Sequence, residues 1–192
     1  MIEKKIIEIA FHGRGGQTAI TASKLLAEMA YECGFKDAIS IPIIGAERRG
    51  APIQAFSKIS RDAQIRSYCS VTDPDFMLIF DTTLLKIPRV FATIKEGVIL
   101  IINSNHKIDF NNNLQKSVKI YIVDATGISL KYGLAIEGFP ILNIPMLGAF
   151  AKISGFYGLD IMEKVIKKKF GSRAEKNMKT ARDAFETVKE MI

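Results

Sequence analysis

A strand, a glycine-rich turn and a helix follow one another at the start of this chain. Residues 4–11, KKIIEIAF, are apolar and β-branched, which predicts a strand. The glycine-rich stretch HGRGG follows, and apolar residues then recur near helical spacing up to Gly34, which predicts a helix ending there. Strand, tight turn and helix in this order are the beginning of a βαβ unit. The chain is thereby constrained to an α/β architecture.

Later segments repeat the alternation of strand and helix. Three short apolar runs are typical of buried parallel strands: residues 74–81, 98–103 and 118–124. Helices are predicted over 82–97, 125–134, 145–158 (begun by Pro145), 159–171 and 174–192, and a polar, asparagine-rich excursion over 104–117. The pattern predicts one domain over 1–192, a Rossmann-like three-layer α/β domain with a mainly parallel sheet and C-terminal helices.

The segment between the first helix and residue 74 departs from this pattern. Residues 37–41 predict a second strand, and the two prolines and two glycines within 42–52 predict a loop. Residues 53–60 alternate apolar and polar side chains, which predicts a half-solvated strand. A turn and a further short strand over 63–70 would complete an antiparallel hairpin inserted beside the parallel sheet.

Cysteine usage limits the metal chemistry of the chain. The sequence holds two cysteines, Cys33 and Cys69, and neither has a cysteine or histidine neighbour at ligand spacing. A four-thiolate iron–sulfur cluster or structural zinc site built by this chain alone is therefore excluded. Two reduced, buried thiols are expected, as in a cytoplasmic protein. The charged first strand is not a secretory signal, and the longest apolar run is too short to span a membrane.

The chain is basic, with a formal net charge of +7 that comes largely from its C-terminal third. Such an excess occurs in proteins that bind nucleic acid or an acidic protein partner, but most basic faces are solvated. No aromatic residues interleave these lysines as they do on single-strand-binding surfaces. We therefore expect a solvated face, with neither nucleic acid nor membrane as a partner.

The glycine turn has two interpretations. Helix N-termini attract anions, so the segment Gly13, Arg14, Gly15, Gly16 and Gln17 is a candidate anion-binding site. The alternative is that the glycines permit a sharp turn and close helix–sheet packing. The dinucleotide fingerprint requires a third glycine at position 18, but this residue is threonine. The lysine that a phosphate-binding loop needs after its last glycine is also missing. Nucleotide binding is not established by this motif.

A charged loop follows the second predicted strand. Glu47, Arg48, Arg49 and Gly50 lie in a segment that cannot be regular. Unpaired charges are costly to bury, so this loop is exposed or pairs with something outside the chain. Loop arginines bind carboxylates and phosphates and are frequent anchors of protein interfaces. A solvated turn is the alternative.

The other polar candidates are weaker. His12 is expected to be a packing or hydrogen-bonding residue, and His106 to be solvated. Asp81, Asp124 and Thr126 follow predicted strands, where ligands bind in open α/β sheets, but helix capping is the favoured role for the latter two. No nucleophile–base pair or catalytic carboxylate pair is recognisable, so no catalytic residue is assigned.

Five stretches, taken in order, resemble one family. The chain is similar to gamma subunits of the pyruvate:ferredoxin oxidoreductase family of 2-oxoacid:acceptor oxidoreductases. The resemblance covers essentially the whole chain and rests on FHGRGGQTAITASKLLAEMA, IGAERRGAPIQAFSKIS, PDFMLIFDTTLL, VDATGISL and IPMLGAFAKISG. Thr18 departs from the family pattern, which commonly has glycine after GRGGQ.

The resemblance implies an activity and a set of partners. It implies oxidative decarboxylation of pyruvate to acetyl-coenzyme A, with electrons passed to ferredoxin by a hetero-oligomer of alpha, beta, gamma and delta subunits. Thiamine diphosphate, magnesium and iron–sulfur clusters would be bound by partner subunits. Coenzyme A would be the anionic ligand near the glycine turn, and the loop at 47–50 an inter-subunit contact. The stretch ERRGAP favours pyruvate; the alternatives are a branched-chain 2-oxoacid, 2-oxoglutarate, or a stand-alone Rossmann-type nucleotide-binding oxidoreductase.

Overall fold

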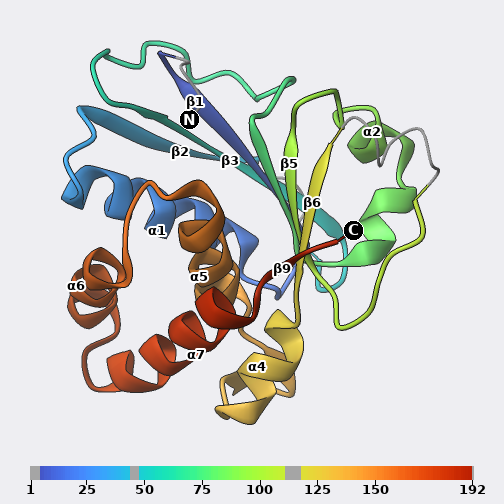
Figure 1. Cartoon of the computed structure of the whole chain (residues 1–192), viewed down its shortest axis with the longest axis vertical. Helices are drawn as coiled ribbons and strands as arrows, with labels where there is room; N and C mark the ends of the chain where they lie inside the picture. The colour runs from blue at the N-terminus through green and yellow to red at the C-terminus, as the bar shows by residue number, and fades with distance from the viewer. Residues whose placement is uncertain (1–4, 44–47, 111–117, 192) are drawn as a thin grey trace.

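The computed structural model describes residues 5–43, 48–110 and 118–191, which form a seven-stranded sheet with helices against its faces (Figure 1). The strand order is β2-β3-β1-β4-β5-β6-β9, and a separate two-stranded sheet pairs β7 with β8. The strands are β1 (Ile7–Arg14), β2 (Asp37–Ile43), β3 (Pro52–Ser60), β4 (Phe76–Ile79), β5 (Ile99–Asn103), β6 (Lys119–Val123), β7 (Ala135–Ile136), β8 (Phe139–Pro140) and β9 (Lys189–Glu190).

The helices divide between the two faces. The helical elements are α1 (Ala19–Glu32), η1 (Thr82–Lys86), α2 (Pro88–Phe91), α4 (Ala125–Lys131), α5 (Asn143–Ser154), α6 (Leu159–Phe170), η2 (Gly171–Arg173) and α7 (Ala174–Thr187). One core cluster joins the sheet to α1, α5, α6 and α7, and a second lies under α2 and the chain that follows β5. The three-layer α/β prediction is confirmed, because β1, β4, β5 and β6 pair in parallel.

The antiparallel insertion differs from the prediction. Residues 63–70 form no strand, and β2 and β3 make the hairpin instead. Strand β3 lies between β2 and β1 and pairs antiparallel with both. Because it is flanked on both sides, it is buried from Ala55 to Ser60 and is not half-solvated. Period-two alternation was misleading here, since Ser57 and Lys58 are polar yet buried.

The loop predicted over 42–52 is shorter in the structure, because the strands on both sides extend into this range. β2 continues through Pro42 to Ile43, and β3 begins at Pro52. A proline is tolerated in β2 because this strand is at the edge of the sheet, where one side of its backbone has no ladder partner. Residues 44–47, including Glu47, are outside the described ranges.

The end of the chain also holds an unpredicted strand. β9 pairs antiparallel with β6 through two residues, a length too short to leave a sequence signal. The preceding helices α6 and α7 bury their apolar faces and expose their basic ones. Several of the lysines pair with acidic side chains: Lys164 with Glu32, Lys169 with Glu28, Lys167 with Glu163, and Lys179 with Glu175. These ion pairs neutralise part of the positive charge within the chain. The expectation of two buried thiols is wrong for Cys69, which is exposed, and only partly right for Cys33, which is half-buried.

Candidate functional site

The glycine turn and the arginine loop lie against one another. The amide of Gly15 donates to the carbonyl of Ala51 at 2.9 Å, and the amide of Gly50 donates to the carbonyl of Gly15 at 3.1 Å. A Cβ on Gly15 would lie 2.4 Å from the carbonyl oxygen of Arg48. Glycine is therefore required at position 15 by the approach of the second loop. Two motifs about 35 residues apart are joined into one site.

Arg14, at the end of β1, is held by the same assembly. Its Nε lies 3.0 Å from Oδ2 of Asp81, and one terminal nitrogen donates to the hydroxyl of Thr83 at 2.6 Å. The other terminal nitrogen donates to the carbonyl of Gly50 at 2.8 Å. Gln17 completes the arrangement: its Oε1 accepts from the amide of Arg14 at 2.8 Å and its Nε2 donates to Asp81 at 3.4 Å. Every nitrogen of the guanidinium already has a protein partner.

Asp81 stays ionised in this setting. Partial burial acts to raise the pKa of its carboxyl, but hydrogen bonds from Thr83 and the charge of Arg14 outweigh burial and lower the pKa below its ordinary value of 3.8. The pair is therefore charged and mutually neutralised at neutral pH.

This pair spans the place where an open α/β sheet usually holds its ligand. The connection after β1 leads to α1 on one face, whereas the connection after β4 leads to η1 and α2 on the other. Ligands of such sheets bind beyond the carboxyl ends of the strands at this divergence. Here Arg14 and Asp81, from the ends of β1 and β4, bridge the crevice. Arg14 would have to leave Asp81 to bind a phosphate or carboxylate.

The remaining residues of the glycine turn shape the start of α1. A Cβ on Gly13 would lie 2.9 Å from Cβ of Ala19, so this glycine permits close packing of the helix on the strand. Gly16 has a φ of +98° and faces open space. No side chain caps the N-terminus of α1. The packing interpretation thus has direct geometric support at Gly13 and Gly15, and the anion-binding interpretation stays a prediction.

Thr18 adopts a left-handed conformation, with φ 64° and ψ 22°. Its hydroxyl donates to the carbonyl of Gln17 at 2.6 Å and accepts from the amide of Asn143 at 3.1 Å. A left-handed backbone favours glycine, which is the residue expected here from the family pattern. The threonine keeps the conformation and adds a link to the first residue of α5.

The arginine loop has a second contact that the sequence did not suggest. Arg49 forms an ion pair with Glu137, and its guanidinium carbon lies 5.5 Å from the centre of the Phe139 ring. Both partners belong to the β7–β8 hairpin. Arg48 is exposed, and Glu47 lies outside the described residues. Gly138 alone is a weak turn signal and gives no indication of the contact with Arg49.

His12 is buried on the opposite face of β1 from the α1 core. Its Nδ1 lies 3.3 Å from the side-chain amide of Gln54. Nε2 is buried without a hydrogen-bond partner among the described residues. Burial, reinforced by the positive charge of Arg89, lowers the pKa of His12 from 6.5 to about 4. The packing role expected for this residue is confirmed, and His106 is exposed as expected.

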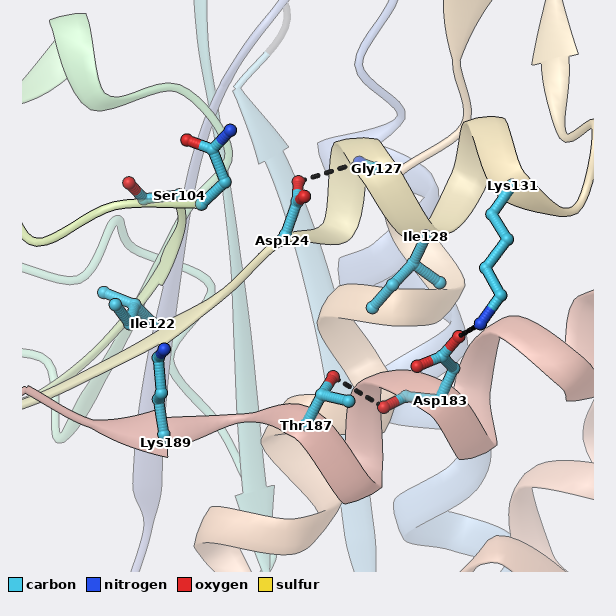
Figure 2. Close-up of a pocket in the computed structure, with 10 residues that line it drawn as sticks. Ser104, Ile122, Asp124, Gly127, Ile128, Lys131, Asp183, Thr187 and Lys189 are labelled. Carbon is cyan, nitrogen blue, oxygen red and sulfur yellow. Dashed lines mark hydrogen bonds and ion pairs between the residues drawn. The ribbon is translucent and has the colours of Figure 1, made fainter.

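A second polar cavity, of about 450 Å³, lies beyond β5 and β6 between α4 and α7 (Figure 2). Asp124 accepts from the amide of Gly127 at 2.8 Å and thereby caps α4, as predicted. Lys131 reaches across the cavity to Asp183 at 2.7 Å. Thr126 is not a cap: its hydroxyl and amide bond to the side chain of Asn103. These contacts give the cavity a structural role in seating α4 on α7.

Over residues 5–43, 48–110 and 118–191, no three or more histidine, cysteine, aspartate or glutamate side chains are grouped so as to hold a metal ion. Within the same ranges, no helix has the length and hydropathy to cross a membrane.

Comparison with known proteins identifies the family. The family model described as pyruvate ferredoxin/flavodoxin oxidoreductase matches residues 8–187. The chain is 40% identical to pyruvate synthase subunit PorC of Methanothermobacter thermautotrophicus, over 97% of this chain and 98% of that protein. It is 43% identical to the pyruvate/ketoisovalerate oxidoreductases common subunit gamma of Thermococcus kodakarensis, over 94% and 96% of the two chains.

Solved structures agree. The crystal structure of the PORC subunit of pyruvate oxidoreductase from Thermotoga maritima matches with a TM-score of 0.80 and 35% identity, over 98% of this chain and 100% of that one. The 2-oxoglutarate:ferredoxin oxidoreductase of Magnetococcus marinus shares the fold over 30% of its length, with a TM-score of 0.73 and 18% identity. From its strand order, its glycine turn and these end-to-end matches, the chain belongs to the pyruvate ferredoxin/flavodoxin oxidoreductase family.

Proposed function

We propose that this chain is the gamma subunit of a cytoplasmic, multi-subunit pyruvate:ferredoxin oxidoreductase that converts pyruvate and coenzyme A to acetyl-coenzyme A. The observation that supports this most directly is the match to gamma and PorC subunits over nearly their whole length. Local geometry supports a non-catalytic role, because Arg14 and Asp81, the charges at the ends of β1 and β4, are paired with each other.

Reaction chemistry in this proposal belongs to partner subunits. Thiamine diphosphate with magnesium would take up the electrons released by decarboxylation, and iron–sulfur clusters would carry them to ferredoxin. The described residues of this chain do not fit a metal or a cluster, since no group of suitable ligands is present in them. Its own residues would contribute shape and contacts to the alpha, beta and delta subunits.

A second candidate concerns the substrate. Relatives from Thermococcus kodakarensis and Pyrococcus furiosus are named as common gamma subunits of pyruvate and ketoisovalerate oxidoreductases. This favours a gamma subunit that is shared between two complexes. Purification of the native complexes through a tag on this chain, followed by assays with pyruvate, 2-oxoisovalerate and 2-oxoglutarate, distinguishes the cases. Turnover by the isolated chain, or recovery from its natural host without any thiamine-dependent subunit, would contradict the proposal.

The glycine turn, Gly13 to Gln17, is proposed to contact the anionic part of coenzyme A in the assembled enzyme. The contact requires Arg14 to exchange Asp81 for the ligand. Asp81→Asn would weaken the competing partner and should lower KM for coenzyme A several-fold, whereas Arg14→Gln should raise it at similar kcat. If both variants change kcat alone, the turn has only a structural role.

The arginine loop, Glu47 to Gly50, is proposed to be an inter-subunit contact. Arg48→Ala and Arg49→Ala should each reduce recovery of the complex while the isolated chain keeps its thermal stability. Arg66→Ala, an exposed arginine in the segment after β3, is the matched control and should have no effect. Full recovery with both loop variants would contradict this assignment.

A further inference from the structure

The β7–β8 hairpin has an unusual residue at its tip. Its central residues are Glu137, with φ +49°, and Gly138, with φ +81°. Two positive φ values in a two-residue hairpin loop are the pattern of a type I′ turn, which favours Asn-Gly or Asp-Gly. A left-handed conformation at a residue such as glutamate costs roughly 1 kcal/mol. Asparagine would suit this backbone better, so the presence of glutamate at position 137 is not explained by the turn conformation.

Glu137 uses its carboxylate to bind the arginine loop. It pairs with Arg49, and the guanidinium also lies over the ring of Phe139, so one arginine contacts both sides of the hairpin tip. The arginine loop is in turn bonded to the glycine turn through Gly15 and Gly50. Hairpin, arginine loop and glycine turn therefore form a connected assembly.

This assembly leaves large apolar side chains uncovered. Ile136 is 58% exposed and Phe139 is 50% exposed, on either side of the turn. Arg48 lies exposed on the adjoining loop and has no ion-pair partner among the described residues. Aromatic residues and arginines are enriched among the anchors of protein interfaces, and such anchors are typically surrounded by polar contacts.

We infer that Arg48, Ile136 and Phe139 form a docking surface for a neighbouring subunit of the oxidoreductase, a role that rests on the proposed function. Ile136 and Phe139 enter an apolar pocket of that subunit, and carboxylates at the rim of the pocket pair with Arg48. Charge favours this occupant over a second copy of the chain, because each copy carries a net charge of +7 and the surface itself presents Arg48, which is exposed. Glu137 is a positioning residue that holds Arg49 and the loop in place.

The test is assembly of the complex from the full-length chain, tagged at its N-terminus and expressed with the other subunits. The double variant Ile136→Ser/Phe139→Ser should bind the thiamine diphosphate-containing subunit at least about tenfold more weakly than the wild type. Tyr68→Ser is the matched control: Tyr68 is 69% exposed, in the segment that joins β3 to β4 at the amino ends of the parallel strands, whereas the glycine turn and the arginine loop lie at the carboxyl end of β1. It should bind within about twofold of the wild type.

A second variant tests the role of Glu137 with a substitution that should not destabilise the fold. Glu137→Asn suits the left-handed backbone but removes the partner of Arg49. It should leave the isolated chain at least as stable as the wild type and still weaken assembly several-fold. Unchanged assembly would show that the arginine loop does not depend on the hairpin and would overturn this part of the inference.

The outcomes separate the inference from the proposed function. If the wild-type chain recovers no thiamine-dependent subunit, the proposed function fails. If the wild type assembles and the double variant assembles equally well, the docking surface is overturned and the proposed function remains. Sedimentation of the isolated chain gives a further check, since a dimer that the double variant abolishes would make a second copy the occupant and also overturn the inference.

Discussion

His12 places an imidazole in the sheet interior, with 2% of its surface exposed. The unfolded chain binds a proton at this residue below pH 6.5, whereas the folded chain does so only near pH 4, because burial lowers the pKa. Between these values the unfolded state binds more protons, so the stabilisation present above pH 6.5 is lost as the pH falls towards 4. A shift of this size corresponds to about 3 kcal/mol.

Denaturant unfolding at pH 7 and pH 4.5 measures this dependence. The wild type should lose about 2–3 kcal/mol more stability than His12→Gln, which keeps a polar side chain but does not titrate. Asp81 does not confound the comparison, because its lowered pKa keeps it ionised above pH 4. Equal losses in the two proteins would mean that the imidazole is not buried in its neutral form.

Thr18 makes a prediction that separates backbone strain from hydrogen bonding. Thr18→Val keeps the branched side chain in a left-handed conformation and removes the hydroxyl that accepts from Asn143, which should cost about 2 kcal/mol. Thr18→Gly loses the same hydroxyl but relieves the backbone, so it should cost at least about 1 kcal/mol less. Thermal unfolding of the two variants gives the difference, and a glycine variant as unstable as the valine variant would refute the strain argument.

At the scale of elements, the close packing of α5 against α7 depends on Gly148. A Cβ on this residue of α5 would lie 2.4 Å from the carbonyl oxygen of Ala181 in α7. Gly148→Ala should therefore push the helices apart and destabilise the fold by about 1–3 kcal/mol, despite the better helix propensity of alanine. Lys152→Ala is the control: it removes an exposed side chain of the same helix whose ammonium lies 4.9 Å from the centre of the Phe185 ring in α7, and it should cost less than about 1 kcal/mol. Melting temperatures of the three proteins decide the matter.

The strands that sequence reasoning predicted best are those buried on both faces. β4 is apolar and buried throughout, and β5 and β6 are largely apolar apart from Asn103 and Lys119 at their ends, so burial explains most of their composition. Residues 63–70 alternate like a strand but have no ladder to join, since β3 is already paired on both sides. Alternation is a local property, whereas pairing depends on which strands are neighbours. The same reason hid β9, which exists only because β6 passes beside the chain's last residues.

In the candidate site, too, local patterns could be predicted from the sequence but long-range contacts could not. Sequence patterns pointed to Arg14, Arg49 and Asp81 separately, because each belongs to a recognisable turn, loop or strand end. Their pairing could not be foreseen: Arg14 with Asp81, and Arg49 with Glu137, are contacts across 67 and 88 residues. A pair of opposite charges leaves no local sequence signal when its members lie on different elements.

At the scale of the whole molecule, the net charge of +7 should govern how fast the chain joins its complex. A basic chain that associates with acidic neighbours is steered by long-range attraction, which salt screens. The association rate with the remaining subunits should fall roughly tenfold between 50 and 300 mM salt, while the dissociation rate changes much less. Stopped-flow mixing of labelled gamma chain with the other subunits measures both rates. A flat salt response would show that the surplus lysines face solvent in the complex.

Neither edge of the seven-stranded sheet is well suited to pair with a strand from another chain. On one side Pro42 interrupts the row of amide donors along β2, and on the other side the two-residue β9 covers the middle of β6. Because its edge strands pair poorly with other strands, the chain should resist edge-to-edge aggregation before it joins its complex. Its neighbours must recognise it through side chains and loops, so mutations that spoil assembly should cluster in those places and leave the sheet backbone untouched.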